Sequence, residues 1–336
     1  MRRYSGPRGA TRTGLALGLA GLLAATLAGC GVTRGESTRD LLMIIPNSPG
    51  GGYDQTGREA VKVMEAEEVT GGSFTVDNIV GAGGAGAMTS LMGRAGDENT
   101  MMTVGLGVVG STYSFASEYD VGDGTPLAQL MSEPEGILVA ADSPYQTIDD
   151  LVEAWKADPA SIPVGGGSSP GGPDHLFPMQ LAAEVGIDPN DVNYVTYDGG
   201  GPLTSALLGD KIGIGFSGLA EFAGYVESGE LRVLAISGEQ RYPDGSQFAD
   251  VPTLTESGID LVFLNWRGVL APPDISEERT EELIGYLETM HESQGWQDAL
   301  DEYGWTDDFK TGDDFAQFID EQDQRVSGTL EELGLL

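Results

Sequence analysis

The stretch LLMIIPNSPGGGYD, residues 41–54, decides the fold class of this chain. Its first five residues are apolar, as in a buried strand, and a glycine-rich turn at 49–52 follows directly. Apolar residues then recur at helical spacing between Ala60 and Val69. A strand, a glycine-rich turn and a helix form the first part of a βαβ unit, so the stretch predicts an α/β protein with a parallel sheet.

The same succession of elements recurs along the chain. Glycine-rich turns that follow a predicted strand and open a predicted helix occur at 81–86, 165–175 and 198–202. Ligands of open α/β sheets bind at the carboxyl ends of strands, in turns of this kind. We therefore expect the turns to form one site, and we expect the apolar stretch 261–270 to cross back between the two halves of the chain.

The amino terminus has the pattern of an exported lipoprotein. Four arginines within the first 12 residues precede an uncharged apolar run at 15–28, which is shorter than the roughly 20 residues that span a bilayer and indicates a signal peptide. The run ends in LAGC, residues 27–30, which resembles the bacterial lipobox. We expect residues 1–29 to be the leader, Cys30 to carry the lipid that anchors the protein to the outer face of the cell membrane, and 30–40 to be a tether.

Two alternatives remain open at this end of the chain. Cys30 is the only cysteine, so no disulfide can form within the chain, but it could also be an incidental residue after an ordinary signal peptide. The pair Arg2 and Arg3 leaves the export route open between general secretion and twin-arginine export.

The charge of the chain excludes some partners. It holds 17 Lys and Arg against 53 Asp and Glu, a formal net charge of −36, which repels nucleic acid and anionic lipid headgroups. Backbone N–H groups at helix amino termini can nevertheless hold an anion without cationic side chains. The glycine-rich turns could therefore bind a carboxylate within a strongly acidic protein.

Signals for catalysis are weak. The turn 81–86 matches G-x-G-x-x-G, so a nucleotide-dependent enzyme is the alternative function, but the acidic residue expected about 20 residues later is missing. His175 and His291 are the only histidines and lack metal-ligand spacing. Ser168 and Ser169 precede His175 but do not stand in a nucleophile elbow. We expect no catalytic residue, no cofactor and no metal.

Several motifs carry a family resemblance. The strings PGGGYD at 49–54, followed by Arg58, and VDNIVGAGG at 76–84 resemble signatures of the extracytoplasmic receptors of tripartite tricarboxylate transporters, the Bug family. Further matches in order are YDG at 197–199, VPTLTESG at 251–258 and WRGVLAP at 266–272. The chain departs from the family pattern at Ala85, often asparagine, and at Arg267, often aromatic, and its 165–175 turn is one residue longer.

The resemblance implies a fold and a function. The fold is a two-lobe periplasmic-binding-protein fold, type II-like, with two crossing strands, residues 41–136 and 262–336 in lobe 1 and 137–261 in lobe 2. The function is to bind a tricarboxylate or dicarboxylate in the interlobe cleft and deliver it to the integral membrane subunits of a tripartite tricarboxylate transporter. The resemblance implies a receptor and no enzyme, and we expect a monomer.

Carried over by position, the resemblance also implies the ligand-binding residues, in three groups. They are Gly51, Tyr53, Asp54, Gly83 and Gly84 in lobe 1, Ser168, Ser169, His175, Tyr197, Gly199, Gly200 and Ser217 in lobe 2, and Trp266 and Arg267 on a crossing strand. Because two carboxylates repel each other, Asp54 is expected to cap its helix and not to touch an anionic ligand. Arg267 could contact the ligand or form a salt bridge with one of the many acids.

Overall fold

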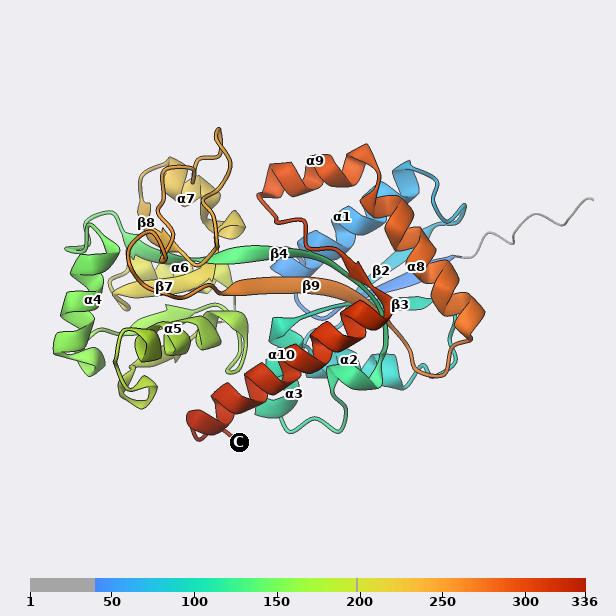
Figure 1. Ribbon diagram of the computed structural model, residues 1–336, viewed down its shortest axis with the longest axis horizontal. Coiled ribbons are helices and arrows are strands. Elements are labelled where there is room, and N and C mark those ends of the chain that lie inside the picture. Colours follow the sequence, from blue (N-terminus) through green and yellow to red (C-terminus); the bar gives the residue numbers. More distant parts are fainter. Residues whose placement is uncertain (1–39, 198) are drawn as a thin grey trace, which may run out of the picture. The chain divides into compact units, whose positions relative to one another are not determined.

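The computed structural model describes residues 40–197 and 199–336, and Figure 1 shows the arrangement of their strands and helices. Cys30, the predicted leader and nearly all of the predicted tether lie outside the described residues, as does Asp198.

One group of strands holds the amino-terminal glycine-rich turns. It runs in the order β2, β1, β3, β9, β4, with β2 (Phe74–Asn78), β1 (Leu41–Ile45), β3 (Thr100–Gly105), β9 (Leu264–Ala271) and β4 (Thr125–Ala140). The first three strands are parallel, β9 is antiparallel to β3, and β4 is antiparallel to β9. The short β10 (Lys310–Thr311) pairs with β4. The parallel core predicted from the strand and helix pattern is confirmed for β1, β2 and β3.

The second group of strands repeats this plan on the other half of β4. It runs in the order β8, β4, β7, β5, β6, with β8 (Leu231–Ile236), β7 (Ile214–Gly218), β5 (Val164–Gly166) and β6 (Tyr194–Thr196). The strands β5, β6 and β7 are parallel to one another, and β7 and β8 are antiparallel to β4. The carboxyl ends of β5 and β6 lead into the two glycine-rich turns of this half.

Two long strands connect the halves. The first part of β4 pairs with β9 and its last part pairs with β7 and β8, so β4 belongs to both groups, and Figure 1 shows β4 and β9 running side by side between them. The predicted crossing stretch 261–270 corresponds to β9. The full length of β4 is not apparent from the sequence, because Glu133, Pro134 and Glu135 interrupt its apolar pattern.

The helices bury apolar faces against these strands. In the α1 region, Val61, Val63 and Met64 pack in one core cluster with Met43 and Trp296. The helices are α1 (Gly52–Ala66), α2 (Ala85–Met92), α3 (Leu106–Ser114), α4 (Ile148–Ala157), α5 (Pro173–Glu184), α6 (Gly200–Leu208), α7 (Ala223–Glu227), α8 (Glu277–His291), α9 (Gln294–Tyr303) and α10 (Gly312–Glu332). Among the described residues, none of the helices is both long and apolar enough to cross a membrane.

Candidate ligand-binding cavity

A cavity of about 780 Å³ opens where the glycine-rich turns meet. Residues from the turns before α1, α2, α5 and α6 line it, together with residues of β4, β7 and β9. The predicted site residues that line the cavity are Gly51, Tyr53, Gly83, Ser168, Ser169, Tyr197, Gly199, Gly200, Ser217 and Arg267. A volume of this size suits a small-molecule ligand.

Glycine is required at Gly83 for two separate reasons. Its φ of +61° lies in the left-handed region, which side chains with a Cβ rarely adopt. A Cβ there would also lie 2.8 Å from the Cβ of Ser111 and 2.9 Å from the Oγ of Ser169. Gly83 and Ser169 belong to turns of different halves, so the absence of a side chain lets the two turns approach each other across the cavity.

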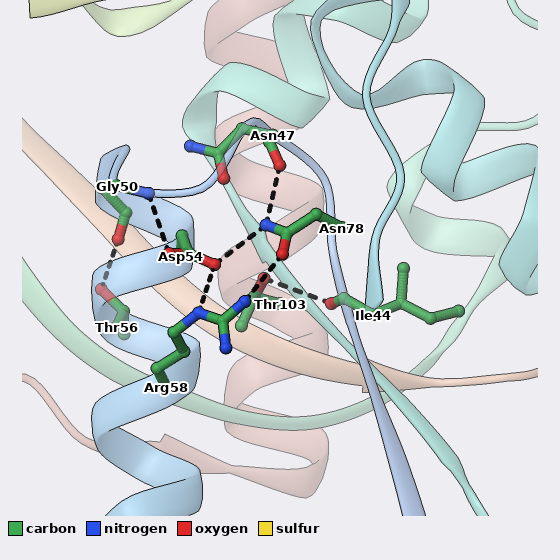
Figure 2. A network of polar contacts seen from close by, with 9 residues as sticks. Ile44, Asn47, Gly50, Asp54, Thr56, Arg58, Asn78 and Thr103 are labelled. Atoms are coloured by element: carbon green, nitrogen blue, oxygen red, sulfur yellow. Dashed lines mark hydrogen bonds and ion pairs between the residues drawn. The ribbon is translucent and has the colours of Figure 1, made fainter. Parts of the chain in front are cut away.

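Asp54 braces the turn that enters α1, as Figure 2 shows. Its Oδ2 accepts a hydrogen bond from the Gly50 amide at 2.9 Å, and its Oδ1 accepts from Arg58 Nε at 2.7 Å and from Asn78 Nδ2 at 2.9 Å. Asn78 Nδ2 also donates to the Asn47 carbonyl at 2.9 Å. Burial disfavours the ionised form, but these donors outweigh it and lower the pKa of Asp54. Asp54 therefore holds the turn in place and does not line the cavity.

Three further predicted residues also lie behind the cavity wall. His175 Nδ1 accepts a hydrogen bond from the Gly171 amide at 3.2 Å, and burial lowers the pKa of His175 to about 4, so the ring is neutral near pH 7. Trp266 packs edge-on against Phe315 and Phe318. Gly84 approaches Val108, whose Cγ2 would lie 2.9 Å from an added Cβ. These residues shape the site from outside its lining.

Arg267 lines the cavity and also forms a buried ion pair. Its Nη2 lies 2.6 Å from Oε1 of Glu133, and both residues are nearly buried, at 7% and 5% exposure. Its guanidinium lies 5.6 Å from the centre of the Tyr53 ring and packs on Gly52, where an added Cβ would come within 2.2 Å of Nη2. Arg267 therefore forms the salt bridge, which is one of its two expected roles, and it also lines the cavity, as contact with a ligand would require.

Three carboxyl groups outside the predicted ligand-binding set line the same cavity: Glu133, Asp174 and Glu221. Asp174 Oδ2 accepts from the Gly167 amide at 2.7 Å, and Glu221 Oε2 accepts from the Gly200 amide at 3.2 Å. In a chain with 53 acids no single carboxylate is distinctive, so nothing in the sequence marks Glu133 or Glu221, and Asp174 stands out only by its place at a helix start. Their positions depend on the tertiary fold.

The surroundings of Asp174 and Glu221 favour the protonated forms of these two carboxyl groups. Burial raises the pKa of Asp174 to about 7, with the charges of Glu221 and Glu133 adding to it and the Gly167 amide and Ser217 opposing it. Burial also raises the pKa of Glu221, although its side chain reaches solvent through the cavity. The cavity wall is therefore an environment in which negative charge is costly.

Asp174→Asn tests this environment through stability. The pKa of Asp174 is higher in the folded chain than the ordinary 3.8, so its ionisation destabilises the fold progressively as the pH rises from about 4 to about 7. An asparagine does not ionise, so we expect the melting temperature of the variant minus that of wild type to increase between about pH 4 and pH 8. Thermal unfolding across this range measures the difference, and a difference that falls with pH would show that Asp174 is stabilised as an anion.

Within residues 40–197 and 199–336, no group of three or more His, Cys, Asp or Glu side chains is arranged to hold a metal ion. The acids of the cavity are instead paired with Arg267 or with backbone amides.

Comparison with known proteins assigns the family. Residues 60–335 match the model of the tripartite tricarboxylate transporter family receptor. Protein BugT of Bordetella pertussis is 26% identical over 305 residues, which cover 88% of this chain and 90% of BugT. The structure of the periplasmic binding protein BugD superposes with a TM-score of 0.76 at 20% identity, covering 89% and 99% of the two chains.

A third protein, from R. palustris and solved with adipate, superposes with a TM-score of 0.78 at 22% identity, covering 88% of this chain and 98% of that one. These likenesses confirm the two-lobe periplasmic-binding-protein fold expected from the motifs. Members of the matched family are receptors. The family match therefore favours a receptor over the nucleotide-dependent enzyme considered for the 81–86 turn. The chain belongs to the Bug family of tripartite tricarboxylate transporter receptors and is a solute-binding protein, not an enzyme.

Proposed function

We propose that the chain binds a small carboxylate, a dicarboxylate or tricarboxylate, in the 780 Å³ cavity and delivers it to the membrane subunits of a tripartite tricarboxylate transporter. The observation that carries the proposal is the meeting of four glycine-rich helix starts around one cavity. Helix amino termini present backbone N–H groups to an anion. The R. palustris neighbour solved with adipate supports the carboxylate class.

We propose that this cavity is the cleft between the two lobes expected from the sequence, 41–136 with 262–336 and 137–261. Gly51 and Gly83 come from the first lobe, and Ser168 and Gly199 from the second. A ligand that contacts both sets would favour the closed arrangement by its greater affinity for that state. Binding and lobe closure would then be one event, which a membrane subunit could recognise.

The location of the receptor follows from the same proposal. A receptor that hands a solute to membrane subunits works on the extracytoplasmic side, close to the membrane. The lipobox-like LAGC at 27–30 would provide that proximity through a lipid on Cys30. We propose that the protein is held at the outer face of the cell membrane in this way and acts as a monomer.

Calorimetry with purified full-length protein in detergent tests the function. We expect at least one acid in a set of C4 to C6 dicarboxylates, tricarboxylates and their amino-substituted forms to bind with micromolar affinity. Gly83→Val should abolish that binding, because its side chain would collide with Ser111 of the same lobe and with Ser169 of the other lobe. Micromolar binding that survives Gly83→Val would place the ligand elsewhere, and binding of none of these acids would contradict the proposed function.

A further inference from the structure

One contact between the two halves of the chain lies outside the cavity lining. Tyr242 belongs to the segment 237–253, which follows β8 in the second group of strands, and Gly304 ends α9, which packs against the first group. A Cβ added to Gly304 would lie 2.5 Å from Cε1 and 2.8 Å from Cδ1 of Tyr242. The ring of Tyr242 therefore fills the space that a side chain at position 304 would need, and neither residue lines the cavity.

The contact lies beside β4, where this strand passes from the first group to the second. Ser132 of β4 exchanges two backbone hydrogen bonds with Thr306, at 3.1 and 2.7 Å. Further along the same strand, Gly136 pairs with Ile236, the last residue of β8. The contacting residues stand close to Thr306 and to Ile236 in the chain. A rotation of one half against the other about this part of β4 would therefore change the contact.

The segment that carries Tyr242 is fixed to the second half on both sides of the ring. Arg241 Nε lies 2.7 Å from Oε2 of Glu256, and Arg241 Nη1 donates to the Asp250 carbonyl at 3.3 Å. The rings of Tyr242 and Phe248 lie 5.4 Å apart, and Phe248 is buried in the core cluster that contains residues of β8. Tyr242 therefore moves with the second half and meets the first half at Gly304.

Gly304 meets two separate requirements. As the last residue of α9 it has a φ of +68°, and its amide donates to the Leu300 carbonyl. Asparagine also adopts this left-handed conformation, so the helix end alone does not require glycine. The approach of Tyr242 does require it, because it excludes any Cβ at this position. The two requirements can thus be separated by substitution.

We propose that Tyr242 is a positioning residue that holds the two halves in the arrangement that forms the cavity, by packing on the bare backbone of Gly304. The same arrangement brings Gly83 against Ser169 across the cavity. Loss of the Tyr242 contact would favour more open arrangements and so weaken the binding of a ligand that contacts both halves. This inference rests on the proposed function, but it assigns residues that do not touch the ligand.

Gly304→Asn in the full-length protein in detergent tests the contact. The asparagine can keep the left-handed φ, but its Cβ would collide with the ring of Tyr242. We expect calorimetry to show binding about 5- to 150-fold weaker for the acid that wild type binds most tightly in a set containing succinate, adipate and citrate. Gly229→Asn is the matched control, because the φ of Gly229 is +75° and no atom lies within 4 Å of its added Cβ. It should bind like wild type.

Tyr242→Ala tests the same contact from the other half. Removing the ring should weaken binding by about 5-fold or more. Adding Gly304→Asn to this variant should weaken binding by less than about twofold further, because the collision is gone. Tyr242→Phe keeps the ring and should bind like wild type.

The outcomes separate this contact from the proposed function. Equal affinity of wild type and Gly304→Asn would overturn the proposal and leave the receptor standing, as would a loss that is undiminished in the Tyr242→Ala background. Should Gly304→Asn not fold, wild-type affinity in Tyr242→Ala would overturn it. Binding of none of the acids to wild type would contradict the proposed function instead. The contact is then judged by hydrogen exchange of the 165–175 turn, which should be faster in Gly304→Asn than in wild type and Gly229→Asn; equal exchange would overturn the proposal.

Discussion

Arg267→Met is expected to lower the free energy of unfolding by about 3 kcal/mol. Methionine replaces the unbranched aliphatic part of the arginine side chain but not its charge. Glu133, which is only 5% exposed, is then left without its cationic partner. Removing one member of a buried ion pair leaves an uncompensated charge in a poorly hydrated place, which costs far more than the pair itself contributes. Urea unfolding of wild type and variant measures the change.

The structure offers both a rescue and a control for this variant. Adding Glu133→Gln removes the uncompensated charge, so the double variant should recover at least half of the lost stability. Arg241 and Glu256 form a pair of similar length, 2.7 Å, but their side chains are 42% and 47% exposed. Arg241→Met should therefore cost less than about 1 kcal/mol. Equal losses from Arg267→Met and Arg241→Met would contradict the buried-pair description.

Gly110→Ala is expected to weaken ligand binding by about 5- to 150-fold while leaving the protein folded. A Cβ on Gly110, in α3, would lie 1.8 Å from the carbonyl oxygen of Gly171, in the turn before α5. Overpacking of this kind costs about 1–3 kcal/mol in the arrangement that contains the contact, and about 1.4 kcal/mol is tenfold in affinity. If the lobes can separate, that cost falls on the closed state and not on folding.

The thermal stability of the ligand-free protein distinguishes lobes that can separate from a rigid fold. Alanine is the better helix former by about 1 kcal/mol, so with separable lobes Gly110→Ala should match or exceed the melting temperature of wild type. Gly285→Ala in α8 is the control, since no atom lies within 4 Å of its added Cβ. A large loss of thermal stability in Gly110→Ala, with none in Gly285→Ala, would show that the contact belongs to a rigid fold.

The sequence predicted the cavity through its glycine-rich turns. A glycine between a strand and a helix leaves the backbone N–H groups at the helix start accessible, and this depends only on the local sequence. The importance of Gly51, Gly83 and Gly199 could therefore be predicted from the residues next to them. The bracing role of Asp54 could be inferred for the same reason, because its partners Gly50 and Arg58 lie within one helical turn.

The carboxyl groups in and behind the cavity lining could not be predicted from the sequence, because their positions depend on the tertiary fold. Glu133 and Glu135 interrupt what is in the structure a 16-residue strand, and they are buried only because β9, β7 and β8 pair around them. Glu221 reaches the cavity through a hydrogen bond to Gly200, 21 residues away. Trp266 is part of a family motif and was expected at the ligand, but it packs on α10. Alternate residues of β9 face opposite sides, so Trp266 and Arg267 point in opposite directions.

A crystal structure with the tightest-binding acid from the calorimetric panel tests the central claim most directly. The account predicts a carboxylate within hydrogen-bonding distance of backbone amides in the 780 Å³ cavity, between the Gly51 and Gly83 turns of one half and the Ser168 and Gly199 turns of the other. A ligand bound outside this cavity, or one held there without any contact to these turns, would contradict it.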